Sequence, residues 1–223
     1  MKNRTFKLVY QSSYLALGFI ALLASFGLFQ YNFRQDFYVY FTNLSNYLCI
    51  AVMVAEFIET VRHTDNRYTS VLPKLKFASV LAIMTTFFVY NFVLVPAQNI
   101  TRVSQFEISS FLFHMVLPLM FTADWFLFYE RKKVKWLYPL FALLVPFVYG
   151  IYIYVRAAVY GFNADKTLLY PYFFMNIRTM GVTNVVKWLS VMLVVYVACG
   201  YVLLLVDRII PKNINKNRKG ETK

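Results

Sequence analysis

Six long stretches of this chain contain no charged residue, and they restrict its fold more than any other feature. They cover residues 8–33, 37–55, 77–101, 108–123, 136–155 and 188–206. A helix on the surface of a soluble protein exposes a polar face and therefore carries charge every turn or two. Apolar stretches close to about 20 residues long are instead typical of helices that cross the hydrocarbon core of a bilayer. We therefore expect an all-α integral membrane protein, a bundle of six transmembrane helices.

Composition supports this fold class. Of the 223 residues, 60% are apolar and 15% are charged, whereas soluble domains are ~25% charged. These proportions exclude a disordered chain, a disulfide-stabilised scaffold and an ordinary water-soluble enzyme. We expect one transmembrane domain over residues 1–210 and a basic cytoplasmic tail over 211–223. The six spans are predicted at about 11–31, 37–58, 76–96, 107–128, 136–156 and 185–207.

The first span resembles a signal peptide, because three basic residues precede it. Its apolar run is longer than the 7–15 residues of a signal sequence, and no small-x-small cleavage site follows before Arg34, so we expect it to be retained. If the N-terminus is cytoplasmic, 17 of the 23 lysines and arginines fall in cytoplasmic segments. Cytoplasmic loops carry the excess of basic residues. The sequence therefore predicts two cytoplasmic termini and a multi-pass location in the plasma membrane.

The net charge of +13 is explained by basic inner loops that face anionic headgroups, so the bilayer and not nucleic acid is the expected partner. The segment 157–184 is too apolar for water and too short to span. We expect it to lie at the outer interface and to cover the bundle. The two cysteines fall within spans and predict no disulfide. No motif for a metal, a phosphate or another cofactor is present.

Polar side chains inside spans are costly in hydrocarbon, and each one is therefore a functional hypothesis. Counting a rise of 1.5 Å per residue puts Thr42 and Asn91 ~8 Å below the outer ends of spans two and three. His114 comes ~10–12 Å below the outer end of span four. The three side chains are therefore expected in one layer of the outer leaflet. Asp124 is expected near the inner end instead, as an interfacial salt bridge with the basic loop at 131–135.

The surroundings of His114 suggest a shaped site. Pro118, at i+4, has no N–H for the carbonyl of His114, which predicts a kink there. Ser110 lies one turn away on the same face and can orient the ring. Two structural alternatives stay open, because Thr42 can simply bond a neighbouring helix or its own turn and His114 can make a satisfied interhelical bond.

Three short motifs resemble a known family. They are the run Tyr40–Asn46 (Tyr-Phe-Thr-Asn-Leu-Ser-Asn), His114 with Pro118, Asp124 and Trp125, and the run Tyr170–Phe174 (Tyr-Pro-Tyr-Phe-Phe). Together they look like bacterial six-span relatives of the androgen-induced-gene and androgen-dependent tissue-factor-regulating protein family. Animal members hydrolyse fatty acid esters of hydroxy fatty acids with an intramembrane threonine and a histidine from another helix. The resemblance implies that Thr42 and His114 hold these roles.

The sequence hypothesis is thus a lipid-ester hydrolase in which Thr42 attacks the ester and neutral His114 takes its proton. The chain lacks G-x-S-x-G and H-E-x-x-H motifs, so an enzyme here needs an unconventional nucleophile. Further candidates are Asn43 or Asn91 for the oxyanion, Ser110 for orienting the imidazole, and Tyr90, Tyr149 and Tyr152 for an acyl-chain groove. The alternatives are a small transporter or ligand-binding membrane protein that uses the same pocket, and a non-catalytic assembly protein. The lack of an internal repeat weighs against the transporter.

Overall fold

The computed structural model describes residues 4–31, 33, 36–63, 70–129, 132–160 and 169–210. Every regular element within these residues is a helix. The predicted tail, 211–223, and residues 161–168 of the predicted outer loop lie outside the described residues.

Six helical segments are long and apolar enough to cross a membrane, which confirms the predicted number. They are α1 (Arg4–Ser25); α2 (Phe41–Arg62); α3 (Pro73–Val89), η2 (Tyr90–Leu94) and α4 (Val95–Gln98); α6 (Ile108–Phe111), η3 (Leu112–Val116) and α7 (Leu117–Phe128); α8 (Tyr138–Ala142) and α9 (Leu144–Tyr160); and α12 (Val182–Ile209). Among the described residues, the short helices that connect them include η1 (Leu28–Gln30), α5 (Arg102–Gln105), η4 (Phe173–Met175) and α11 (Ile177–Met180).

The first two spans differ from their predicted bounds. The first begins at Arg4 and ends at Ser25, because Gly27 takes a left-handed conformation (φ 78°) that ends the helix. The second begins at Phe41, after a turn over residues 36–39, so Thr42 lies in the first turn of α2. Thr42 was expected more than one turn below the helix end.

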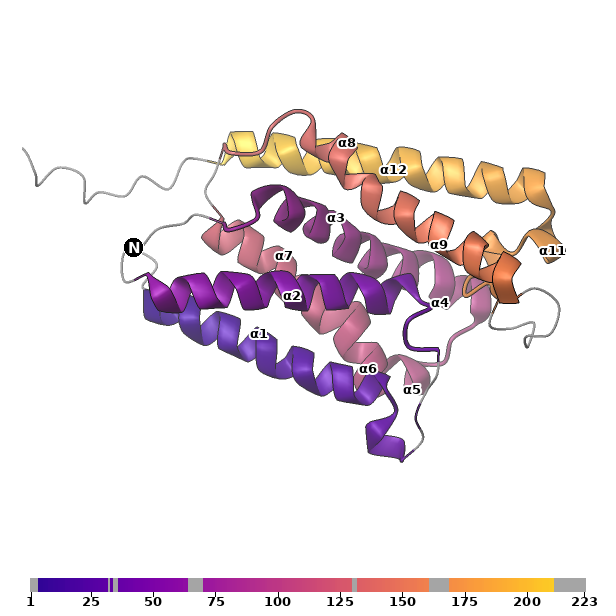
Figure 1. Cartoon of the computed structure of the whole chain (residues 1–223), viewed down its shortest axis with the longest axis horizontal. Helices are drawn as coiled ribbons and strands as arrows, with labels where there is room; N and C mark the ends of the chain where they lie inside the picture. Colours follow the sequence, from indigo (N-terminus) through magenta and orange to yellow (C-terminus); the bar gives the residue numbers. More distant parts are fainter. Residues whose placement is uncertain are drawn as a thin grey trace, which may run out of the picture.

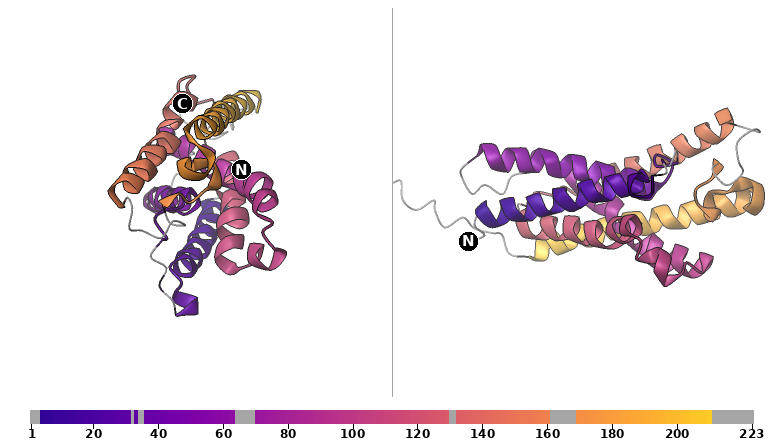
Figure 2. Two further views of the ribbon diagram at one scale, coloured as in Figure 1. Left: turned by 90° about the vertical axis from the view of Figure 1, so that its right-hand side faces the viewer. Right: turned by 90° about the horizontal axis from the view of Figure 1, so that it is seen from below.

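The six segments run roughly along one axis (Figure 1, Figure 2), and the start of α1 and the end of α12 lie at the same end of the bundle. We call this the N-terminal end. The opposite end carries the start of α2 and the segment 169–176. Arg4 joins α1 to α2 at the N-terminal end, where its guanidinium donates to the carbonyls of Thr60 and Val61 in the last turn of α2.

Helix α3 lies at the centre of the bundle. It packs against α2, α7 and α8, and every residue from 76 to 83 is buried. Around it lies an apolar core that includes Tyr14, Met53, Phe121 and Trp125. Gly200 brings α12 close to α8, because a Cβ at that position would lie 2.9 Å from the Cβ of Pro139. Small residues of this kind allow membrane helices to approach closely.

Helices α9 and α12 each leave one apolar face uncovered, as helices in contact with lipid do. The exposed residues on α12 include Val191, Val194, Val195, Val202 and Leu205. At the opposite end of the bundle, Tyr172, Phe174 and Met175 are buried in a second apolar cluster with α9. The segment 169–176 therefore packs against the bundle at this end, whereas the position of 157–184 at the outer interface stays a prediction.

Candidate functional site

Two π-helical turns face one another at the opposite end of the bundle, and each stands just before a proline. Turn η2 begins at Tyr90 and turn η3 contains His114. The two rings are stacked, with centroids 3.5 Å apart and planes 13° from parallel. A proline ring clashes with the carbonyl four residues before it, and a widened turn relieves that clash. The distortion that Pro118 predicted is thus a π turn, a feature often found at functional sites.

The wide turn η3 leaves one carbonyl without a partner in its own helix. The N–H of Leu117 bonds the carbonyl of Leu112, five residues earlier. In that register the carbonyl of Phe113 would need an N–H from Pro118, which has none. Asn46 of α2 supplies the donor instead, because its Nδ2 lies 3.0 Å from that carbonyl oxygen and 2.8 Å from the carbonyl oxygen of Thr42.

Asn46 therefore ties the turn that carries Thr42 to the turn that carries His114. Its side chain is fully buried. No role was predicted for it, although it stands one helical turn from Thr42 on the protein-facing side of α2. An amide at i+4 from a candidate nucleophile is the sequence signal that could have identified it.

The hydrogen bonds of His114 define its tautomer. Nδ1 lies 2.9 Å from the carbonyl oxygen of Ser110 and 3.3 Å from its hydroxyl. A carbonyl only accepts, so Nδ1 of the neutral ring carries the proton and Nε2 is left as an acceptor. The Ser110 hydroxyl lies 2.9 Å from the hydroxyl of Tyr90. Ser110 therefore lies beside the imidazole, as its position one turn from His114 predicted.

Thr42 is buried at the start of α2, where backbone N–H groups have no partner within the helix. The N-cap residue, Tyr40, provides no side-chain cap. The phenol oxygen of Tyr172 does so instead, and accepts a hydrogen bond from the N–H of Thr42 at 3.3 Å. Burial raises the pKa of Tyr172, while hydrogen bonds from the side chain and backbone of Thr42 and from the backbone of Phe41 act against that rise. The phenol therefore stays protonated and can also donate.

Two hollows meet at this point. A polar pocket of about 310 Å³ has Thr42 and His114 among its lining residues. An almost wholly apolar cavity of about 530 Å³ lies between α3, α9 and α12. Thr42, Tyr90, Leu94 and Tyr172 line both, so these four side chains form the boundary between a polar and an apolar compartment.

The remaining predicted site residues do not lie at the boundary between the two pockets. Asn43 lines the polar pocket, but its Nδ2 donates to the carbonyl of Phe37 at 2.9 Å. Asn91 lines neither hollow and donates to Phe87 of its own helix. Tyr149 lines the apolar cavity, whereas Tyr152 lines neither hollow.

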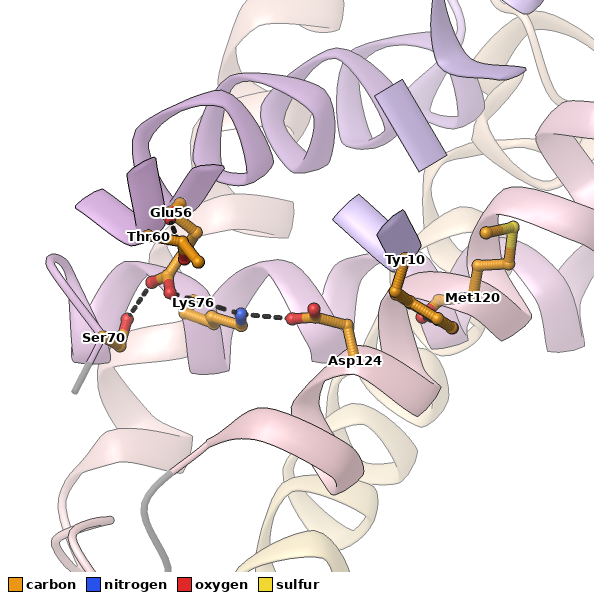
Figure 3. A network of polar contacts seen from close by, with 7 residues as sticks. All are labelled: Tyr10, Glu56, Thr60, Ser70, Lys76, Met120 and Asp124. Atoms are coloured by element: carbon orange, nitrogen blue, oxygen red, sulfur yellow. Dashed lines mark hydrogen bonds and ion pairs between the residues drawn. The ribbon is translucent and has the colours of Figure 1, made fainter. Parts of the chain in front are cut away.

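A second polar cluster lies near the N-terminal end (Figure 3). Lys76 of α3 forms an ion pair with Asp124 of α7 and lies 3.7 Å from a carboxylate oxygen of Glu56 of α2, which also accepts a hydrogen bond from Ser70. Lys76, Glu56 and Asp124 are buried. The expected pairing of Asp124 with the basic loop at 131–135 is therefore wrong, because Asp124 points into the bundle toward the central helix. Glu56 is fourteen residues from Thr42 on α2, about 21 Å along the axis, so this cluster is separate from the pocket.

Among the residues that the structure describes, no group of three or more His, Cys, Asp or Glu side chains is arranged to hold a metal ion. Comparison of the chain with protein-family models, with curated proteins and with solved structures finds no match.

Proposed function

We propose that this chain is an intramembrane lipid-ester hydrolase in which Thr42 is the nucleophile and His114 is the general base. One observation carries the proposal: Thr42 and an imidazole held in the Nδ1–H tautomer line one pocket, at its boundary with an apolar cavity. A hydroxyl is a weak nucleophile unless a positioned base takes its proton. The boundary gives an amphipathic ester a polar side and an apolar side.

The chemistry follows two steps. Thr42 Oγ1 attacks the ester carbonyl carbon while Nε2 of His114 takes its proton, and the imidazolium then returns that proton to the leaving alkoxide. The products are an acyl-threonine and a free alcohol. Water next attacks the acyl carbon with His114 again accepting a proton, and collapse of that intermediate releases the fatty acid and restores the Thr42 hydroxyl. Base assistance of this kind accelerates such steps by ~10²- to 10⁴-fold.

The negative charge on the carbonyl oxygen needs donors beside Thr42. Asn43 or Asn91 was predicted to supply this donor, but both amides donate to backbone carbonyls elsewhere. The protonated phenol of Tyr172 and the N–H groups at the start of α2 are better situated, because they already meet at Thr42. A helix N-terminus also favours negative charge.

The acyl chain fits the apolar cavity. Its lining includes Phe41, Val89, Leu94, Leu189 and Met192, and its volume lies within the range of ligand pockets, about 300–1,000 Å³. In the proposed orientation both termini are cytoplasmic, and the pocket lies in the outer leaflet of a bacterial plasma membrane. The proposed family is the androgen-induced-gene and androgen-dependent tissue-factor-regulating protein family, which the three motifs resemble.

Labelling by a fluorophosphonate probe tests this proposal. The purified protein in detergent is expected to form a covalent adduct that peptide mapping assigns to Thr42. Thr60→Ala is the matched control, since Thr60 is a threonine of the same helix with the same 7% exposure. It is expected to label normally, whereas Thr42→Ala and His114→Ala are expected not to label. An adduct elsewhere, or equal labelling of Thr42→Ala, rejects Thr42 as nucleophile and favours the ligand-binding alternative.

A further inference from the structure

The polar pocket has a pronounced chemical character. Two carboxylates, Asp36 and Glu107, are among its lining residues, and none of the described residues that line it is a lysine or an arginine. Neither carboxylate forms an ion pair within the described part of the chain. Arg102, the described basic residue nearest to Glu107 in the sequence, does not line the pocket.

Aromatic rings supply much of the remaining wall. They belong to Phe37, Tyr40, Tyr90, Phe113 and Tyr172. Carboxylates combined with aromatic side chains are the chemistry by which proteins recognise ammonium groups, because the faces of the rings and the carboxylates both attract a positive charge. A carboxylate or a phosphate placed in the same pocket would meet repulsion from Asp36 and Glu107, and no described lining residue offers a compensating cation.

The boundary at Thr42 decides which part of an ester would enter this pocket. Among the described residues that line the apolar cavity none is charged, so the acyl chain belongs there. An ester whose carbonyl lies at Thr42 then extends its alcohol half into the polar pocket. The pocket volume, about 310 Å³, suits a small group and not a second long chain.

We propose that the alcohol half of the substrate is a small cationic group, an amino alcohol or a quaternary-ammonium alcohol such as choline. This inference rests on the proposed hydrolase function and defines its substrate class. It differs from what the family resemblance implies, because a fatty acid ester of a hydroxy fatty acid carries both a carboxylate and a second long chain on its alcohol half.

Three decanoyl esters with different alcohols test the inference: the choline ester, the glycerol monoester and the ester of 3-hydroxypropionate. With the wild-type protein in neutral detergent at low ionic strength, kcat/KM is expected to be about tenfold higher for the cationic than for the anionic ester, since partly exposed charges each contribute modestly. The preference is expected to shrink in high salt, which screens such charges. Equal or higher turnover of the anionic ester overturns the inference.

Charge-removing variants connect the preference to the pocket. The Asp36→Asn/Glu107→Gln double variant is expected to lose most of the preference, so that its kcat/KM ratio for the cationic over the anionic ester approaches one. Glu59→Gln is the matched control, because Glu59 lies near the other end of α2, where it pairs with His63. It is expected to behave as wild type. An undiminished preference in the double variant shows that these carboxylates do not select the alcohol.

Binding separates failure of this inference from failure of the proposed function. The Thr42→Ala protein is titrated with the unreactive decyl ether of choline and with the decyl ether of 3-hydroxypropionate, with a thermal shift as readout. Tighter binding of the cationic ether supports the pocket assignment even if no ester is hydrolysed, a result that would remove the hydrolase function alone. Equal binding, or tighter binding of the anionic ether, contradicts the inference whatever the turnover.

Discussion

The imidazole of His114 lies flat against the ring of Tyr90, with centroids 3.5 Å apart, and each residue belongs to a π-helical turn that precedes a proline. The same relationship brings the hydroxyl of Tyr90 to Ser110, which in turn contacts Nδ1 of His114. The position of the imidazole therefore depends on two helices that are both distorted locally.

Replacing Pro118 tests whether the π turn shapes the site. In Pro118→Ala the new N–H can bond the carbonyl of residue 114 in ordinary α-helical register. The reason for the wide turn is then removed, and we expect His114 to rotate away from Tyr90. We expect turnover to fall at least about tenfold, whereas the melting temperature changes little, because an alanine is a good helix former. Ester hydrolysis and thermal unfolding measure the two effects.

Pro73→Ala serves as the control for this change. Pro73 is the first residue of α3, where a missing N–H costs no helical hydrogen bond, so its replacement is expected to leave turnover unaltered. Normal turnover in a folded Pro118→Ala protein would show that the π turn does not shape the site.

Tyr172→Phe removes the phenol that caps the N–H of Thr42 while it keeps the aromatic ring. If the phenol is a donor to the oxyanion, turnover should fall about 10²-fold, the usual effect of removing one such donor. The lost hydrogen bond should cost only about 1 kcal/mol of the free energy of unfolding. The loss of turnover is expected in the measured kcat. A change confined to stability would limit Tyr172 to a capping role.

The buried ion cluster should act on stability and not on chemistry. In Lys76→Met the carboxylates of Glu56 and Asp124 lose their shared cation, and we expect the free energy of unfolding to fall by about 3–5 kcal/mol. The combined variant Glu56→Gln/Lys76→Met/Asp124→Asn should recover much of that loss, because no buried charge is left unpaired. Unfolding in mixed detergent micelles compares the three proteins. Equal stability of all three would mean that the cluster contributes nothing to folding.

The predicted orientation is testable in intact cells. A cysteine placed at Asp165 or at Lys216, both outside the described residues, is introduced into a protein whose own two cysteines are replaced. A membrane-impermeant maleimide is expected to label position 165 from outside and position 216 only after lysis, given the distribution of basic residues. Labelling of position 216 in intact cells would reverse the topology and move the pocket to the inner leaflet.

Hydropathy and residue counting predicted the six spans and nominated two residues of the candidate site. Six apolar runs predicted six helices, since a membrane span must satisfy its own backbone, and counting residues put Thr42 and His114 in one layer. Counting fixes the spacing between positions on one helix, but not the residue at which the helix begins or its rotation about its axis. Asn91 was expected at the right depth, yet it lies outside both hollows.

The partners between helices depend on packing, which periodicity alone does not reveal. Lys76 stands at the predicted start of the third span, and the periodicity of that span did not indicate that α3 carries it into the centre of the bundle beside Asp124. Asn46 has a role only because the π turn at η3 frees the carbonyl of Phe113. Tyr172 reaches Thr42 from 130 positions further along the chain.

The central claim is that Thr42 and His114 act as one catalytic unit. Turnover of a medium-chain ester tests it most directly, measured for the wild type, Thr42→Ala, His114→Ala, the double variant and the Thr60→Ala control. All five proteins are first checked for monodispersity. Each single substitution should reduce turnover by at least about 10³-fold, and the double variant should be about as inactive as either, because residues that act together are not additive. Thr60→Ala should retain normal turnover. Wild-type turnover by Thr42→Ala, or no hydrolysis by the wild-type protein, would contradict the account.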